Sequence, residues 1–350
     1  MGIYILRRLA LMVPTLLGIL LINFAVVQLT PGGPVEQMLY RLKSGDHANM
    51  NGQTEIQQSG QARGIPPEVI KKIEILYGFD QPAYVRFGQM VVRYLKGDFG
   101  ESFYRNARVT DLIAEKLPVS ISLGLWSTLM IYFISIPLGI LKAVRHGSRF
   151  DVGSSFMLSI LYALPGFLLA MVLIVFFAGG SYWQIFPLRG LTSEGFSDFT
   201  FWQQIKDYFW HLALPLIAYT IGGFATLTAL TKNSFLDEIN KQYVYTARAK
   251  GLTERQVLYG HVFRNAMLII IAGFPSAFVA MFFAGSLLIE VMFSLDGIGL
   301  LSFEAVTQRD YPVFFGSLFM FTLLGLLVKL LSDLVYVWVD PRIHFQHQAQ

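Results

Sequence analysis

Few residues in this 350-residue chain could perform catalysis or bind a metal ion. Its six histidines are scattered, and none has the H-E-x-x-H spacing with which two helical histidines bind zinc. There is no cysteine, which excludes thiolate catalysis, cysteine-ligated metals and disulfides. The chain also lacks the G-x-S-x-G nucleophile motif and any Gly-Lys dipeptide, which a Walker A phosphate loop requires. We therefore predict that the chain is not an enzyme and that any ATP-driven work needs another subunit.

A few polar residues stand beside or inside long apolar segments. His211 has no obvious carboxylate partner nearby in sequence, so we interpret it as a residue at a membrane interface. Lys329 and Asp333 are four residues apart on one helical face and could pair. Both lie toward one end of their apolar segment, so we interpret them as side chains that reach the interface. A proton relay is the alternative interpretation.

Residues 232–266 form a polar segment between two long apolar segments. Leu236, Ile239, Tyr243 and Ala247 are spaced as one apolar stripe of a helix that would lie along a membrane surface. Gly251 follows Lys250 as glycine follows the last turn of a helix. Thr253 and Gln256 then form a capping-box pattern for a second helix. The pattern predicts a helix, a tight glycine turn and another helix.

The composition defines the setting of this polar segment. Hydrophobic residues make up 54% of the chain and charged residues only 14%, with a mean hydropathy of +0.52, which indicates a polytopic all-α membrane protein. The net charge of +4 does not indicate nucleic-acid binding, because the basic residues flank apolar spans. A membrane-spanning helix needs ~20 apolar residues to cross about 30 Å of hydrocarbon. Six stretches qualify: Leu9–Leu29, Pro118–Leu141, Phe156–Ala178, Leu212–Thr231, Met267–Ile289 and Val313–Val339.

Proline recurs inside these stretches. The third span carries Pro165-Gly166 in its middle, where we predict a kink, and Pro137, Pro215 and Pro275 repeat the pattern.

The basic residues predict the orientation. With a cytoplasmic N-terminus, twelve lie on the inner side and three in the short outer loops. The inner ones are Arg7, Arg8, Lys142, Arg145, Arg149, Lys232, Lys241, Arg248, Lys250, Arg255, Arg264 and Arg342, and the outer ones are Arg189, Lys206 and Arg309. Both termini and the polar segment 232–266 are therefore predicted to be cytoplasmic, and the first span is predicted to stay uncleaved.

A long outer segment, residues 30–117, follows the first span. Within it, residues 43–64 contain almost no apolar side chain and are predicted to form a mobile loop. Two amphipathic stretches, Pro66–Gly78 and Tyr84–Lys96, are predicted to form a helical cap. The cap is interpreted as a scaffold packed on the spans, or else as a platform for an extracytoplasmic partner. After the fifth span, residues 293–312 are predicted to be a compact loop with glycine-rich turns.

Several motifs together resemble a known family. The sequence YVYTARAKGLTERQVLYGHVFRNA, Tyr243–Ala266, resembles the EAA loop of ABC-importer permeases of the dipeptide/oligopeptide/nickel group. Further matches occur in order along the chain: RRL near the start, PTLLGILLINF in the first span, YGFDQP (Tyr77–Pro82), YLKGDFGES (Tyr94–Ser102) and RDYP before the last span.

Other features resemble one branch of this family. The residues Pro31-Gly32-Gly33-Pro34 replace the family's usual P-G-D-P, and residues 43–64 look like an insertion. Together with GLWST (Gly124–Thr128), FFAGGSY (Phe176–Tyr182) and LTKNSFLDE (Leu230–Glu238), they resemble the YejB-type branch, which is associated with peptide uptake and with import of the peptide-nucleotide antibiotic microcin C.

The resemblance implies a type I ABC-importer permease fold in the bacterial inner membrane, forming half of a pathway for peptides. The implied partners are a second homologous permease, an ABC ATPase with two domains fused in one chain, and a periplasmic substrate-binding protein. ATP and Mg would be bound by the ATPase, and this chain would bind no cofactor. The residues implied to couple to the ATPase are Glu238, Lys241, Tyr243, Thr246, Ala247, Arg248, Ala249, Lys250, Gly251 and Leu252.

The expected organisation follows from these points. Residues 1–29 form the cytoplasmic N-terminus and first span, 30–117 the periplasmic segment, 118–339 the permease domain with five helices, and 340–350 a cytoplasmic tail. The coupling loop is residues 232–266. A stand-alone ion- or proton-coupled transporter is the alternative, but it predicts an inverted repeat and acidic residues midway through spans, which we do not find. An intramembrane enzyme would need a nucleophile and a base, and no such pair is evident.

Overall fold

The computed structural model describes residues 2–29, 81–102, 104–105, 107–179, 182–283 and 286–339. The predicted loop 43–64, the first cap helix Pro66–Gly78 and the tail 340–350 lie outside these residues. The helices are α1 (Gly2–Leu29), α4 (Ala83–Leu95), α5 (Val109–Val144), α6 (Arg149–Ala163), α7 (Gly166–Phe177), α8 (Phe201–Ile239), α9 (Gln242–Ala249), α10 (Glu254–Val257), α11 (Phe263–Phe283), α12 (Ser286–Met292), α13 (Ile298–Thr307) and α14 (Tyr311–Val339). A short 3-10 turn, η2 (Phe196–Asp198), precedes α8, and one π-helical turn, η3 (Leu258–Val262), joins α10 to α11.

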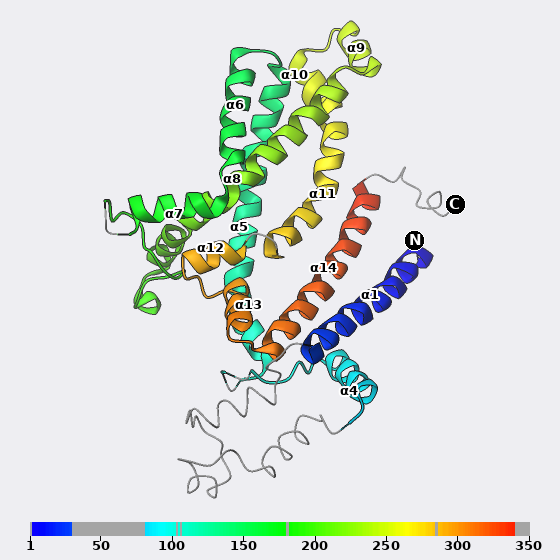
Figure 1. Ribbon diagram of the computed structural model, residues 1–350. Coiled ribbons are helices and arrows are strands. Elements are labelled where there is room, and N and C mark those ends of the chain that lie inside the picture. Colours follow the sequence, from blue (N-terminus) through cyan, green and yellow to red (C-terminus); the bar gives the residue numbers. More distant parts are fainter. Residues whose placement is uncertain are drawn as a thin grey trace, which may run out of the picture.

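The long helices form a bundle around α5 and α8, which pack along one another (Figure 1). The short helices α9 and α10 stand at one end, while α4 and α13 lie toward the other. Helix α1 lies beside α14, and the first residues of α1 and the last of α14 point toward the α9 end. This arrangement agrees with the charge-based prediction that the termini and the polar segment share one side of the membrane.

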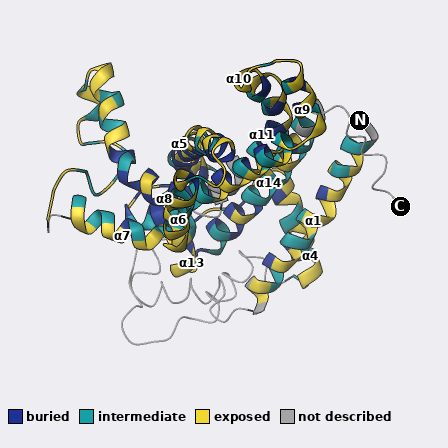
Figure 2. Ribbon diagram, turned by 90° about the horizontal axis from the view of Figure 1, so that it is seen from above, coloured by how far each residue is buried: buried dark blue, intermediate teal, exposed yellow. Residues whose placement is uncertain are grey.

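Much of the bundle's surface is apolar. Phe133, Phe156 and Leu6, which lie on apolar helices, have 82%, 69% and 69% of their surface exposed. Figure 2 shows buried residues gathered near α5 and α8 and exposed ones along α1 and α7. Lipid is the solvent that suits such side chains, because a water-facing surface of this kind would drive association.

Five helices are long and apolar enough to span a membrane, and a sixth span is obtained if α6 and α7 count as one. The six predicted spans are recovered on that count. The third span is not one kinked helix, however, because α6 and α7 meet at a bend of 89°. The break falls at Leu164-Pro165, where proline lacks the N–H for a helical bond and restricts the preceding residue. At Pro137, Pro215 and Pro275 the helix continues.

The predicted loop after the fifth span is largely helical, because it contains α13. Gly297 is the N-cap residue of α13. Leu301 and Ala305, one turn apart, lie on the buried face of this helix. The glycines near the start of this helix obscured its apolar spacing in the sequence. The second cap helix is confirmed as α4, whose buried Tyr94 contacts Phe99 and Phe319 edge-on.

Candidate functional site

The first predicted helix of the polar segment is in fact two helices. The fourth span, α8, continues to Ile239 and ends at Asn240, whose amide donates to the carbonyl of Leu236 over 3.0 Å. Lys241 is extended, and α9 then starts at Gln242. The stripe of Leu236, Ile239, Tyr243 and Ala247 is therefore divided between α8 and α9, because Asn240 and Lys241 break the helix between its halves.

The glycine turn is confirmed. Gly251 has φ +80°, and its N–H donates to the carbonyl of Arg248 over 2.9 Å. A Cβ at this position would meet no atom within 4 Å. Glycine is therefore required for its left-handed backbone, which costs another L-residue roughly 1–2 kcal/mol, and not for lack of space.

The capping box that opens the second helix is also confirmed. The Thr253 hydroxyl accepts from the N–H of Gln256, and the Gln256 side chain accepts from the N–H of Thr253 over 2.9 Å. Helix α10 has only four residues and leads through η3 into α11. The polar segment is thus continuous at both ends with long helices of the bundle.

The face of α9 that points toward the bundle is packed. Val244 is fully buried and Ala247 is 6% exposed, and both join an apolar cluster with Phe235 of α8, Val257 of α10 and Ala266 of α11. The Ser234 hydroxyl donates to the carbonyl of Ala266 over 2.7 Å. Helix α9 thus shares an apolar cluster with α8, α10 and α11, and a hydrogen bond joins α8 to α11, so displacement of α9 would also displace the long helices.

A hydrogen-bonded group reinforces this connection. The Tyr243 hydroxyl donates to Glu238 over 2.7 Å and accepts from the Asn265 amide at 3.3 Å, while Lys241 forms an ion pair with Glu238. Burial raises the pKa of Tyr243, so its hydroxyl keeps the proton that it donates. The hydrogen bond to Glu238 raises the pKa of Lys241 and favours its charged form. The group joins α8, α9 and α11.

Arg248 is engaged within the chain. Its guanidinium donates to both carboxylate oxygens of Glu254, over 2.8 and 3.0 Å, and lies 6.0 Å from the ring centroid of Tyr245. The two-pronged contact spans the glycine turn and links α9 to α10. The hydrogen bonds to Glu254 raise the pKa of Arg248, which is therefore always charged.

The predicted coupling residues divide by exposure. Lys241, Thr246, Ala249, Lys250 and Gly251 are exposed, Glu238, Tyr243, Arg248 and Leu252 are half-buried, and Ala247 is buried. Sequence reasoning missed Tyr245, which is 56% exposed on the outer side of α9. Its signal was its place next to Val244, because consecutive helical residues lie about 100° apart, so the neighbour of a buried residue lies off the buried face.

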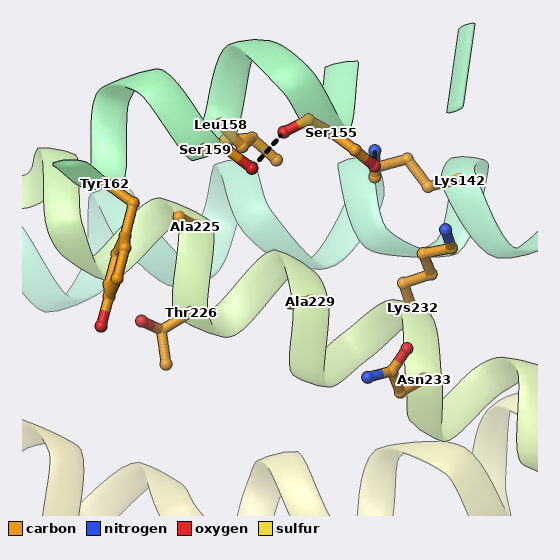
Figure 3. A pocket seen from close by; sticks show the side chains of 10 residues that line it. All are labelled: Lys142, Ser155, Leu158, Ser159, Tyr162, Ala225, Thr226, Ala229, Lys232 and Asn233. Atoms are coloured by element: carbon orange, nitrogen blue, oxygen red, sulfur yellow. Dashed lines mark hydrogen bonds between the residues drawn. The ribbon is translucent and has the colours of Figure 1, made fainter. Parts of the chain in front are cut away.

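A second polar cluster lies at the same end of the bundle and was not predicted. Asp151 is 3% exposed and accepts from the Lys232 ammonium over 2.7 and 2.8 Å. Lys142, also buried, lies 3.2 Å from Asp151 and donates to the hydroxyls of Ser154 and Ser155. Both lysines line a cavity between α6 and α8 (Figure 3). The sequence placed these two lysines at the ends of spans, but it did not reveal that both form ion pairs with Asp151.

A third cluster lies toward the opposite end. Glu290 of α12 is fully buried, accepts from Ser120 over 2.9 Å and accepts from the N–H of Leu300 over 2.9 Å. A Cβ at Gly297 or Gly299 would come within 2.7 Å of the Glu290 carboxylate. The sequence placed Glu290 just beyond a span. Its carboxylate is buried because the start of α13 packs against it.

Two expectations about single polar residues are wrong. His211 does have a carboxylate near it, because Asp207 lies one helical turn earlier and its Oδ1 is 3.6 Å from the histidine ring. Asp333 pairs with Arg8 of α1 at 2.9 Å, and no ion pair joins it to Lys329 in the part of the chain that the structure describes. Among the same residues, no three His, Asp or Glu side chains are arranged to hold a metal ion.

Comparison with known proteins agrees with this architecture. Residues 135–345 match the family model described as "Binding-protein-dependent transport system inner membrane component". Over 99% of this chain and 100% of the relative, the sequence is 58% identical to the "Peptidoglycan transport system permease protein YejB" of Agrobacterium fabrum. It is 55% identical over the same shares to the "Inner membrane ABC transporter permease protein YejB" of Escherichia coli O157:H7.

A more distant relative and one solved structure extend the comparison. The "Oligopeptide transport system permease protein AppB" of Bacillus subtilis is 33% identical over 99% of this chain and 100% of its own length. A chain of the MetNI methionine ABC transporter, 14% identical, superposes with a TM-score of 0.50 over 66% of this chain and 97% of that chain. The latter likeness concerns the fold alone.

Proposed function

This chain belongs to the family of binding-protein-dependent transport system inner membrane components, and from that premise we propose that α9 is its contact with a cytoplasmic ABC ATPase. Membership makes the chain a multi-pass inner-membrane permease subunit of an ABC importer. Such a system works with an ATPase and a substrate-binding protein. The alternative of a stand-alone transporter is not favoured.

One observation carries the proposed contact. Helix α9 stands at the end of the bundle with an exposed outer side, including Tyr245, Thr246, Ala249 and Lys250, while its inner side is packed against α8 and α11. A partner that holds the outer side can therefore move two long helices at once. ATP and Mg would be bound in the ATPase, and the permease would convert the movement into exchange between outward- and inward-open states.

The roles of the ten predicted residues follow from their burial. Lys241, Thr246, Ala249 and Lys250 are available to the ATPase, and Gly251 shapes the turn between the helices. Glu238, Tyr243 and Arg248 position α9 through contacts within the chain. Ala247 and Leu252 pack beneath the helix.

The proposed substrate is a peptide. Relatives of this chain are named for transport of peptidoglycan and of oligopeptides, and they match nearly its whole length. Peptide conjugates of the microcin C type belong to the same proposal. The chain itself would catalyse nothing.

The proposed assembly has four parts. This chain would pair with a second, homologous permease, and each would supply half of the pathway. The ATPase would carry two domains in one polypeptide, and a periplasmic binding protein would deliver the peptide. Residues 118–339 would form the permease domain, residues 232–266 its coupling loop and residues 30–117 a periplasmic segment with a cap.

The test uses Ala249→Trp in the complete reconstituted complex. The large side chain would obstruct the outer side of α9 without entering the buried cluster, because Ala249 is exposed. Loss of a central interface contact costs about 2 kcal/mol or more, so we expect roughly thirtyfold weaker binding of the ATPase and a matching loss of ATP-driven peptide uptake. Copurification of the ATPase and uptake of a labelled tripeptide measure these two effects.

Arg149→Trp is the matched control, since Arg149 is exposed at the start of α6, directly after the other inner loop that the structure describes. It should retain both ATPase binding and uptake. Equal uptake by the parent and the Ala249→Trp complex would refute the assignment of α9. Peptide uptake driven by a proton gradient in the purified chain alone would instead support the stand-alone transporter.

A further inference from the structure

A cavity of about 410 Å³ lies between α6 and α8 (Figure 3). Ser155, Ser159 and Tyr162 line it from α6, and Thr226, Ala229 and Asn233 line it from α8. Lys142 and Lys232 lie together at one end of the view, and Tyr162 and Thr226 lie at the other. The volume falls within the range of about 300–1,000 Å³ that small-ligand pockets occupy.

Helix α6 has two unlike faces. Val152, Phe156, Met157 and Ile160 are 63%, 69%, 56% and 45% exposed and form an apolar face suited to lipid. Ser155, Ser159 and Tyr162 recur at helical spacing on the face that lines the cavity. Polar faces of membrane helices meet protein or a water-filled cavity, because hydrocarbon cannot satisfy their hydrogen-bonding groups. Lipid therefore suits one face of α6 and not the other.

The polar lining continues on α8. Thr226 and Asn233 are exposed and about two helical turns apart, with Ala229 between them. The small side chain of Ala229 leaves the middle of the cavity open. Leu158, Ala225 and Ala229 add apolar surface between these polar groups, so the cavity can contact apolar side chains of a ligand as well as its polar atoms.

The inner end of the cavity carries a net positive charge. Lys142 and Lys232 both contact Asp151, so this group of two cations and one anion has a surplus of one positive charge. A buried or half-buried surplus charge attracts an oppositely charged ligand more strongly than the same charge in water, because the surroundings screen it less.

We propose that this cavity is part of the substrate pathway and holds a short peptide by its backbone and its terminal carboxylate. The hydroxyls of Ser159 and Thr226 donate to carbonyls one turn earlier in their own helices, and their oxygens can still accept from peptide N–H groups whatever the side chains of the peptide are. The amide of Asn233 can both donate and accept. The surplus positive charge beside Lys232 would bind the terminal carboxylate of the peptide. The inference rests on the proposed function, since it assigns a place to the peptide that the complex transports.

The absence of cysteine makes the test direct, because a single introduced cysteine is the only thiol in this chain. Ser159→Cys reports on the cavity, and Phe156→Cys reports on the apolar face of the same helix less than one turn away. The complete complex in proteoliposomes is treated with a membrane-impermeant, anionic thiosulfonate reagent. Labelling is read on this chain after the subunits are separated, with and without trialanine during ATP turnover.

We expect Ser159→Cys to react at least tenfold faster than Phe156→Cys, and trialanine to slow its reaction severalfold. Equal, slow labelling of both variants would overturn the proposal, because lipid or the second permease would then cover the cavity. Fast labelling without protection by trialanine would also overturn it, because the cavity would be wet but would not hold peptide. ATP-driven trialanine uptake by the parent complex is measured separately, so failure of the proposed function is distinguished from failure of this inference.

Discussion

At the scale of single residues, the structure changes the role that we infer for Arg248. In the sequence it is an exposed cation in a helix proposed to meet the ATPase. In the structure its guanidinium is held by both oxygens of Glu254 across the Gly251 turn. We infer that Arg248 positions α9 relative to α10. An exposed pair of this kind contributes little to stability, so its importance would lie in geometry.

Exchanging the two charges tests this role. Arg248→Glu alone should lower ATP-driven uptake severalfold, because two carboxylates would then repel across the turn. Adding Glu254→Arg restores an attractive pair within the chain, and most of the uptake should return. The measurement is uptake per assembled complex. If the double variant is as inactive as the single one, Arg248 contacts the ATPase directly and the positioning role is wrong.

The backbone conformation of Gly251 was predicted correctly from the sequence. Its place after a basic last turn predicted a left-handed residue, and φ is +80°. This was possible because helix termination depends on local backbone chemistry. Glu290 is the contrary case: it accepts from Ser120 and Leu300, which come from elements on either side of it in the chain, and no local pattern brings these groups together.

At the scale of elements, Glu290 joins three helices. Its carboxylate accepts from the first turn of α13 through Leu300 and from α5 through Ser120, while Ser120 accepts in turn from the N–H of Ile298. The first N–H groups of α13 thus receive partners from α12 and α5, which a helix start needs when it is buried. Gly297 and Gly299 let the carboxylate approach the backbone.

Gly299→Ala should therefore destabilise the chain. The new Cβ would lie 2.7 Å from the Glu290 carboxylate and 2.8 Å from the backbone of Leu287, and such overpacking costs about 1–3 kcal/mol. A lower midpoint of thermal unfolding in detergent would report the loss. Gly273→Ala is the control, because a Cβ there meets nothing within 4 Å and alanine favours a helix. Equal midpoints for the two variants would contradict the packing argument.

At the scale of the whole molecule, α1 is held to the bundle near both of its ends. Near its start, Arg8 pairs with Asp333 of α14 at 2.9 Å, and the Tyr4 hydroxyl donates to the same carboxylate over 2.8 Å. Near its other end, Arg86 of α4 donates to Gln28 over 2.9 Å. Many of the described apolar side chains of α1 are exposed, so these polar contacts add to its packing on α14 in holding it to the bundle.

Asp333→Asn tests the attachment of α1. The pair is partly exposed, so its loss should cost about 1 kcal/mol and lower the midpoint of thermal unfolding slightly, while Asp333→Leu, which also removes the acceptor for Tyr4, should lower it further. Lys329→Gln is the comparison, since sequence spacing alone would pair Lys329 with Asp333. A decrease for Lys329→Gln equal to that for Asp333→Asn would contradict the Arg8 assignment.

The sequence by itself determined the apolar spans, the predicted side of the membrane for the termini and loops, and the glycine turn with its capping box. Each depends on residues close together in the chain: the length of an apolar run, the charges beside it or the residues that end a helix. The tertiary structure alone decided the 89° bend between α6 and α7, the place of α13 and the pairing of Asp333 with Arg8. It alone gathered Lys142 and Lys232 around Asp151 and buried Glu290. The partner of a buried charge depends on which distant helices pack beside it. That packing produces no periodic pattern in the sequence.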